Sequence, residues 1–533
     1  MKIGRNEICP KCNSGKKYKK CCGDPRLKDK NNNNVLDKTG LDLSLKKIEA
    51  VEYIKKQQQG LGRPIVQAHA DGKQFVKVGN TVYNSPQWKT FIDFLCDYIR
   101  KVMGGDWGNA EIKKKEEDKH IIIQWYQKFC IHQKRYLSKD GVQSMPTNGV
   151  VHCYLGLAYN LYLLDHNVEL QQIFINRLKD INNFQGAYYE LIVVNCLIRA
   201  GFKLELEDEQ DESTKHCEFS ATSIRTGKKY WVEAKSRSVA GVLGKTEDNG
   251  TTSKDPTSRL SSHIKNALQK PATDERLIFV DVNASCNSEQ PPDWFDRAEM
   301  KLNMKNRDLQ SGVSAYVFVT NFPFHYGLDN EGQTIASLPY GLGIPDFLKA
   351  EPLRLSEIYR RKQKHIDAHN ILESFKSYLH IPQTFDGSLP SECFSDEPNK
   401  IVIGKRYFFE EEGYFATVTT AFVDDENRRV MIGTDVGYLL TKKMSDIEFE
   451  DYKKHPDAYF GVVYRQGRKS ENDYDFFENM VDIHMSYSKE STLKKLENRL
   501  DYERLKLLNK EELVVEYCER LMGTIINRRK SSI

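Results

Sequence analysis

The stretch "GKKYWVEAKSRS", residues 227–238, carries one acid and one base within a strand-like apolar run. Residues two apart in a strand face the same way, so Glu233 and Lys235 should share one face. Their apolar neighbours Trp231 and Val232 make burial of the two charges costly unless each has a partner. Two explanations are open: an exposed ion pair on a surface hairpin, worth about 0–1 kcal/mol, or a catalytic site.

A second acid precedes this stretch. Residues 215–222 and 228–236 have strand patterns, and Thr226-Gly227 in the segment between them suits a hairpin turn. With a two- or four-residue loop, Glu218 lies opposite Lys235 and diagonal to Glu233, on the same face. A loop with one residue more or fewer would send Glu218 to the other face.

Two carboxylates on one face are suited to a cation. Glu218 and Glu233, helped by the Ala234 carbonyl, provide the oxygen ligands that Mg²⁺ or Mn²⁺ takes. Lys235 would then hold the attacking water and offset the charge that grows on a phosphate. The chemistry expected from this set is metal-assisted hydrolysis of a phosphodiester, with DNA as the expected substrate.

The elements around these residues must position them. The patterns predict the order helix, three strands, helix, strand, helix, strand. The first helix ends at Gly201, a C-cap residue type. The expected ranges are 186–201, 202–207, 215–222, 228–236, 258–270, 276–284, 294–305 and 315–322.

This order, with its charged residues, resembles the PD-(D/E)xK nuclease superfamily, the restriction-endonuclease-like fold, over about residues 178–322. The resemblance implies that Glu190 is the helix acid and that Glu218 takes the place of the family's strand Asp. Glu233 and Lys235 would be its Glu-x-Lys pair. It implies a metal-dependent endonuclease. Glu in place of the usual Asp is a departure from the family pattern.

The first thirty residues hold a separate cluster: Cys9, Cys12, Cys21 and Cys22. So short a segment cannot bury an apolar core, whereas four thiolates around one zinc ion supply folding free energy directly. Disulfides or unbound thiols are the alternative. The other eight cysteines lie singly, mostly in apolar runs, which indicates reduced thiols and a cytoplasmic location.

The cysteine segment resembles the SEC-C motif, through Gly4-Arg5-Asn6 and "SGKKYKKCCG" at 14–23. It has Cys-x-x-Cys where the family usually has Cys-x-Cys. The resemblance implies one structural Zn²⁺ per chain and docking to a protein partner or membrane surface. The basic residues of the module, and Arg237 near the Glu-x-Lys pair, also suit a nucleic-acid backbone. The basic residues of the module are Arg5, Lys16, Lys17, Lys19 and Lys20.

The 533 residues carry a net charge of only +4, which excludes a wholly basic nucleic-acid coat. No apolar run approaches the about 18 residues of a membrane span, and no secretion signal is apparent. The fold class expected is α/β, in an α+β multidomain chain. The expected segments are a zinc module 1–24, a flexible linker 25–40, a mostly helical region 41–173, a nuclease-like domain 174–325 with a mixed sheet flanked by helices, a helical connector 326–397, a β-rich domain 398–470 and a helical end 471–533.

The β-rich segment holds a run of aromatics that can either stack on bases or form a core. They are Tyr407, Phe408, Phe409, Tyr414 and Phe415. Two functional hypotheses result. The first is a metal-dependent nuclease with a zinc module for docking, which by analogy suits bacterial defence against foreign DNA. The second is a non-catalytic SEC-C adaptor whose central fold binds nucleic acid or a protein partner.

Overall fold

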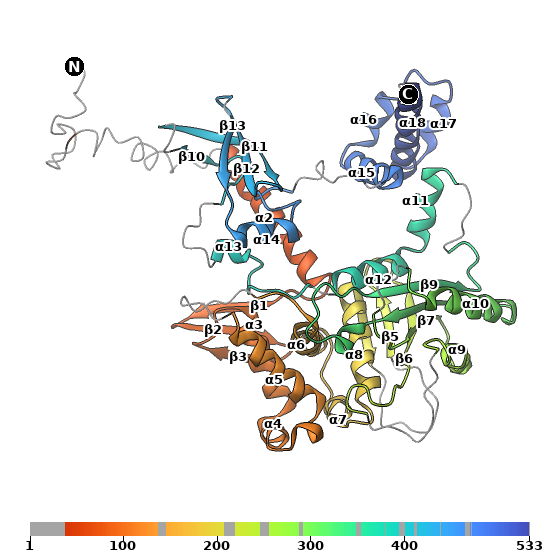
Figure 1. Ribbon diagram of the computed structural model, residues 1–533. Helices are drawn as coiled ribbons and strands as arrows, with labels where there is room; N and C mark the ends of the chain where they lie inside the picture. The colour runs from red at the N-terminus through yellow and green to blue at the C-terminus, as the bar shows by residue number, and fades with distance from the viewer. Residues whose placement is uncertain are drawn as a thin grey trace. The chain divides into compact units, whose positions relative to one another are not determined.

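The computed structural model divides into two compact units, one formed by Met1–Ile54 with Ser388–Lys469 and the other by Lys55–Gly387 with Ser470–Ile533 (Figure 1). The α/β class expected from the sequence is confirmed, because helices and sheets occur in both units. The structure describes residues 17, 38–136, 145–206, 219–245, 255–286, 291–347, 353–378, 380–393, 400–409, 413–437, 439–463, 470 and 472–531.

The second unit is built on a six-stranded mixed sheet with the strands in chain order. Its strands are β4 (Phe202–Leu206), β5 (Phe219–Ser223), β6 (Lys229–Ser236), β7 (Glu275–Asp281), β8 (Ala315–Asn321) and β9 (Ala336–Leu342). The first three pair antiparallel, β6, β7 and β8 run parallel, and β9 is antiparallel. Through β8, the order of elements is the one that the sequence predicts.

The last strand, β9, corrects one expectation. The segment 326–397 is predicted to be a helical connector, yet β9 pairs with β8 along its whole length. Pro339 interrupts the strand pattern in the sequence, and a proline is tolerated here because β9 is an edge strand. The sheet therefore continues beyond the boundary predicted at residue 325.

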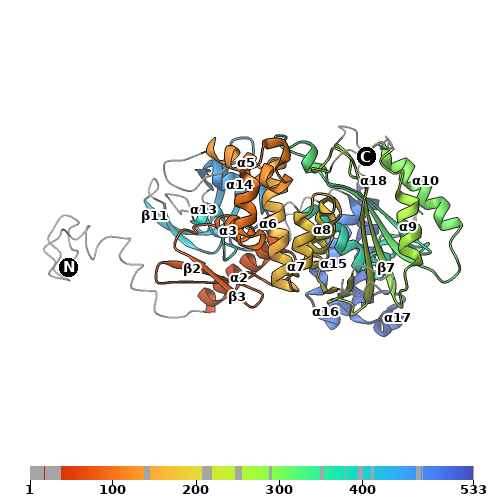
Figure 2. The same cartoon turned by 90° about the horizontal axis from the view of Figure 1, so that it is seen from below.

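Helices cover both faces of this sheet (Figure 2). The long buried helices α6 (Gly149–Asn167) and α8 (Phe184–Arg199) share one core with the sheet residues Val232, Ala234, Leu277, Phe279 and Phe318. The crossover helices α9 (Leu260–Gln269) and α10 (Trp294–Arg307) share a second core with Ile278, Val280, Val317 and Val319. Such crossovers are what parallel strands require.

The second unit also contains a second sheet and further helices. A three-stranded meander comprises β1 (Val66–Ala70), β2 (Lys73–Val78) and β3 (Thr81–Ser85). The remaining elements are α3 (Phe91–Met103), α4 (Gly105–Ile112), η3 (Glu116–Asp118), α5 (Ile121–Lys134), α7 (Gln172–Lys179), η4 (Pro323–Tyr326), α11 (Leu355–Lys364), α12 (Ile366–Ser377), α15 (Asp473–Met485), α16 (Lys489–Lys494), α17 (Tyr502–Leu507) and α18 (Lys510–Ser531). Of these helices, α15 and α18 pack against α11.

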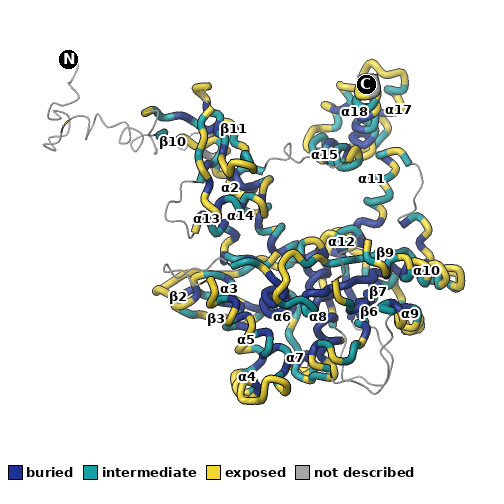
Figure 3. Tube along the Cα trace, in the orientation of Figure 1, coloured by how far each residue is buried: buried dark blue, intermediate teal, exposed yellow. Residues whose placement is uncertain are grey.

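The first unit contains a four-stranded antiparallel meander. Its strands are β10 (Arg406–Phe409), β11 (Tyr414–Asp424), β12 (Arg429–Thr434) and β13 (Leu439–Lys443), beside α13 (Pro390–Cys393) and α14 (Asp446–Lys454). One face of the meander packs on Ala50 and Ile54 of helix α2 (Lys38–Gln59). Buried and exposed positions alternate along its strands, as a sheet with one covered face requires (Figure 3).

In the described residues, no helix is both long enough and apolar enough to cross a membrane.

Candidate catalytic site

The hairpin of β5 and β6 sets the positions of the predicted site residues. Its turn begins at Ser223, whose amide donates to the Lys228 carbonyl at 2.9 Å and whose hydroxyl accepts from the Thr226 amide at 3.2 Å. Gly227 occupies the left-handed region at φ +71°, where glycine is favoured. These contacts place the turn earlier than the sequence alone suggests.

As a result, the hairpin register differs by two residues from the expected one. The predicted register sets Phe219 opposite Ala234, whereas the structure pairs Phe219 with Val232. A shift of two leaves every side chain on its predicted face, because the strand period is two. Glu218 itself lies outside the described residues.

Strand β6 divides its residues between the two faces of the sheet. Tyr230, Val232 and Ala234 belong to the core that contains α8. Glu233 and Lys235 point the other way, and the Lys235 ammonium lies 3.1 Å from the Glu233 carboxylate. Glu233 is only 2% exposed. The structure thus brings these two predicted residues together, and it buries the acid.

A third charged residue completes this cluster, and no local sequence pattern predicts it. The Lys270 ammonium donates to both Glu233 carboxylate oxygens, at 2.7 Å each. Lys270 is the C-cap of α9, the helix that precedes β7. Glu233 is therefore held between two ammonium groups, and this pairing offsets the cost of burying a carboxylate. The cluster carries one negative and two positive charges.

Helix α9 adds a histidine close enough for the charges of the cluster to affect its pKa. Burial lowers the pKa of His263, and the charges of Lys235 and Arg259 lower it further. The lowered pKa favours the neutral form of the ring. Its buried Nε2 atom has no hydrogen-bond partner in the described residues. A neutral imidazole of this kind can accept a proton or a hydrogen bond.

Glu190, the predicted helix acid, lies on α8 and is 6% exposed. It pairs with Arg177 of α7, with guanidinium nitrogens 2.5 and 3.4 Å from its carboxylate oxygens. Helix α8 packs on the sheet face opposite to the one that carries Glu233. The structure thus places Glu190 on a different element and a different face from the lysine cluster.

Arg237 corrects a second expectation. The sequence suggested that it contacts a nucleic-acid phosphate, but the residue is 9% exposed. Its guanidinium donates to the carbonyls of Val282 and Asn283, at 3.3 and 3.2 Å. The side-chain amide of Asn283 in turn donates to the Arg237 backbone carbonyl at 3.0 Å. Arg237 therefore ties together the ends of β6 and β7 inside the protein.

A buried acid lies at the end of β7, and the sequence analysis did not single it out. Burial raises the pKa of Asp281 to about 7. Its carboxylate accepts from the Thr320 hydroxyl at 3.3 Å and from the amides of Phe322 and Asn283 at 3.3 and 3.0 Å. These three donors satisfy the carboxylate within the protein. The raised pKa of Asp281 therefore mainly makes the folding stability depend on pH.

The described residues contain no group of three His, Cys, Asp or Glu side chains arranged to hold a metal ion. Of the expected magnesium ligands, the structure describes Glu233 and Ala234. Their carboxylate and carbonyl oxygens have the chemistry that a hard divalent cation prefers. The four expected zinc ligands lie outside the described residues. Of the basic residues in that module only Lys17 is described, and it is exposed.

Comparison with known proteins identifies the N-terminal module. A family model described as the SEC-C motif matches residues 5–24, the range that contains all four clustered cysteines. This short segment is therefore similar to a zinc-binding type of module. No curated protein and no solved structure matches the chain.

Proposed function

We propose that the protein is a metal-dependent nuclease that hydrolyses phosphodiester bonds, with DNA as the main substrate. The observation that carries the proposal is the buried Glu233 held between Lys235 and Lys270 on the third strand of the central sheet. Further support comes from the element order from α8 to β8, which is the order that the resemblance to PD-(D/E)xK nucleases implies.

Each residue of the cluster has a role in this proposal. Glu233, with Glu218 and the Ala234 carbonyl, would hold Mg²⁺ or Mn²⁺. The cation would neutralise developing negative charge and make a bound water more acidic. Lys235 would donate to that water and to the phosphate. Lys270 orients Glu233 through two hydrogen bonds, and its ammonium must give way when a cation binds.

The N-terminal module would act in docking. Cys9, Cys12, Cys21 and Cys22 would hold one structural zinc ion, since four thiolates make a closed tetrahedral site. The surrounding lysines would add affinity for a nucleic-acid backbone or an acidic partner. A cytoplasmic location and a role in bacterial defence belong to the same proposal, the second by analogy alone.

One observation favours the alternative, a non-catalytic adaptor. Glu233 is already neutralised by two ammonium groups, and the described residues alone do not form a metal-binding cluster. A salt-bridged cluster of this kind can have a purely structural role, in which it stabilises the sheet and takes no part in catalysis. The central fold would then bind nucleic acid or a protein without cutting.

A substrate panel separates the two functions. Supercoiled, linear and single-stranded DNA, and RNA, are incubated with purified protein and Mg²⁺ or Mn²⁺. The variants are Glu233→Gln and Lys235→Ala, with Lys265→Ala on the exposed side of α9 as the matched control. We expect the first two to lose at least about 100-fold in cleavage rate, as when a group that stabilises the transition state is removed. Lys265→Ala should cut like the wild type.

Two outcomes count against the nuclease. Wild-type protein that binds these substrates and cuts none of them would favour the adaptor, and so would cleavage that persists in both site variants. The zinc proposal is tested separately by metal analysis. We expect one zinc ion per chain, lost in Cys21→Ser, and a native preparation free of zinc would reject it.

A further inference from the structure

The outward face of the four-stranded sheet carries apolar side chains where solvent-facing strands usually carry polar ones. Phe422 of β11 is 55% exposed, and Leu439 of β13 is 60% exposed. Phe408, Phe415 and Met431 are half-exposed on the same face. Exposed apolar groups that gather on one surface mark an interaction site more often than chance.

Strand register assigns these residues to a single face. Phe408 pairs with Phe415, and Phe422 pairs with Met431. Paired residues share a face. A bulge between Val418 and Thr420 shifts the register by one residue, so Phe415 and Phe422 lie on the same face although they are an odd number of positions apart. The two phenylalanines of β11 are seven residues apart, roughly 20 Å at about 3.3 Å per residue.

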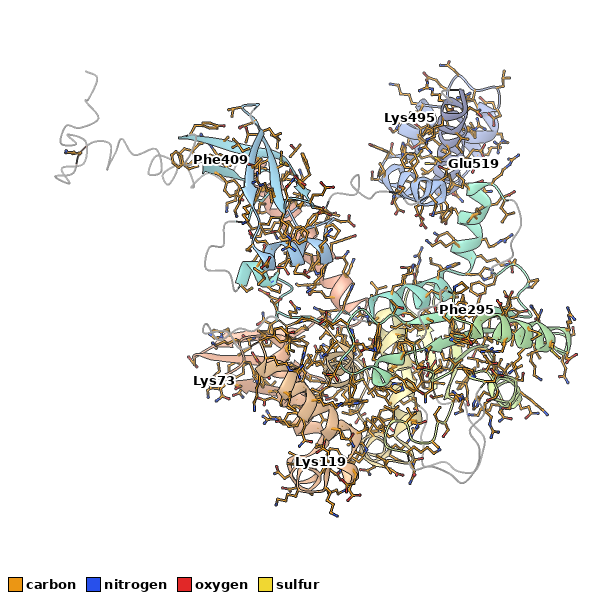
Figure 4. All side chains as sticks on the ribbon, in the orientation of Figure 1. Lys73, Lys119, Phe295, Phe409, Lys495 and Glu519 are labelled. Carbon is orange, nitrogen blue, oxygen red and sulfur yellow. The ribbon has the colours of Figure 1, made fainter. Side chains whose placement is uncertain are left out.

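The aromatic run predicted from the sequence thus divides between two roles. Tyr407 and Phe409, the latter labelled in Figure 4, pack against the core of this unit. The Tyr407 hydroxyl donates to the Lys400 carbonyl at 2.9 Å and accepts from the Val402 amide at 2.8 Å. Phe408 and Phe415 instead face outward, with ring centroids 5.0 Å apart.

Cations lie among the outward aromatics. The Arg406 guanidinium lies over the Phe415 ring, 5.3 Å from its centroid. Arg429 pairs with Lys443 on the adjacent strand, and both are exposed. Two described carboxylates lie near these cations. Asp424 lies opposite Arg429, and Asp435 accepts from the amide of Thr417, the residue paired with Arg406. Among the described residues, three cations and two carboxylates give a net charge of +1.

We propose that this face, defined by Arg406, Phe408, Phe415, Phe422, Arg429, Met431 and Lys443, binds a single strand of nucleic acid. Bases would stack on the phenylalanine rings, and phosphates would contact the cations. This pairing of aromatic rings with positive charge is how strands are bound without base-specific contacts. The proposal extends the nuclease hypothesis and depends on it only for the choice of nucleic acid as ligand.

The test measures binding without added Mg²⁺ or Mn²⁺, so that it does not depend on cleavage. Full-length protein is titrated into fluorescein-labelled 20-nucleotide single-stranded DNA, single-stranded RNA and duplex DNA, followed by fluorescence anisotropy. Phe422→Ala and Phe415→Ala should each weaken single-strand binding about tenfold. Val82→Ala, an equally exposed apolar change on β3, should leave affinity unchanged.

Salt dependence separates stacking from charge. Lys443→Ala should lower the slope of log affinity against log salt by about 0.7, the value for one lost single-strand phosphate contact. Phe422→Ala should weaken binding without changing that slope. A wild-type protein that binds single strands but cuts none of them would reject only the nuclease.

Three results would overturn the proposal: no binding to any strand, affinities in the two phenylalanine variants equal to wild type, or duplex DNA bound as tightly as single strands. The first would leave a protein partner as the occupant of the face. Thermal melting of each variant verifies that it is folded.

Discussion

The two larger sheets of this protein differ in how many of their faces are covered. In the six-stranded sheet, β7 and β8 are buried on both faces, because helices cover both. In the four-stranded sheet, only one face is covered. The residue that stands out in the first is the buried acid Glu233, and in the second the exposed phenylalanine Phe422. In each sheet, the side chain that conflicts with its surroundings is the basis of a proposed function.

The largest predicted effect compares one phenylalanine from each sheet. Phe318 is fully buried and stacks on Phe279 with ring centroids 5.0 Å apart. We expect Phe318→Ala to lower the free energy of unfolding by about 3–5 kcal/mol, because it leaves a cavity. Phe422→Ala should change it by less than about 0.5 kcal/mol, as an exposed substitution does. Urea unfolding followed by circular dichroism measures both. If the two variants lost similar amounts of unfolding free energy, the proposed difference between the two sheets would be wrong.

The second prediction concerns pH. Burial raises the pKa of Asp281 from 3.8 to about 7, so between these values the folded protein holds a proton that the unfolded chain has lost. Its contribution to stability is fully present below pH 4 and is lost as pH rises toward 7, by at most about 4 kcal/mol. We expect the wild type to lose stability relative to Asp281→Asn over this range. A constant difference from pH 4 to 8 would contradict it.

An exposed acid in the other sheet should behave with the opposite sign. A hydrogen bond from the Thr417 amide lowers the pKa of Asp435 below its ordinary value. A lowered pKa gives stability that is present above the unfolded value and is lost as pH falls. Asp435→Asn should therefore reduce stability at pH 7 and have little effect near pH 2, in the same unfolding measurement.

A fourth prediction concerns Lys270, the charge partner of Glu233 that the sequence patterns do not predict. Lys270→Ala removes the two hydrogen bonds to Glu233 and leaves the buried carboxylate with Lys235. We expect a loss of about 2 kcal/mol, since one ammonium remains to offset the buried charge. Lys265→Ala, on the same helix but exposed, should cost less than about 0.5 kcal/mol. Equal stability of the two variants would show that the Lys270 contact contributes nothing.

Local periodicity explains what the sequence could predict. The shared face of Glu233 and Lys235 follows from a two-residue repeat, which holds wherever a strand forms. The order of elements from α8 to β8 follows from patterns within each segment. The outward position of Phe408 and the inward position of Phe409 follow the same repeat, but which face is covered depends on α2, far away in the chain.

The missed features depend on contacts between distant segments. Lys270 reaches Glu233 only because α9 crosses over the sheet, and nothing near residue 270 signals this. The register of β5 and β6 depends on the hydrogen bonds of Ser223, which centre the turn one residue earlier than expected, with Thr226 and Gly227 still inside it. Strand β9 was missed because its proline is acceptable only at an edge.

The most direct test of the central claim is whether Glu233 is a ligand of a divalent cation. Zinc-loaded protein is titrated with Mn²⁺ and followed by electron paramagnetic resonance. We predict one bound Mn²⁺ per chain in the wild type, lost in Glu233→Gln and bound more tightly in Lys270→Ala, where the competing ammonium is gone. Mn²⁺ binding that is absent from the wild type, or unchanged in Glu233→Gln, would contradict the assignment of this cluster as a metal-dependent catalytic site.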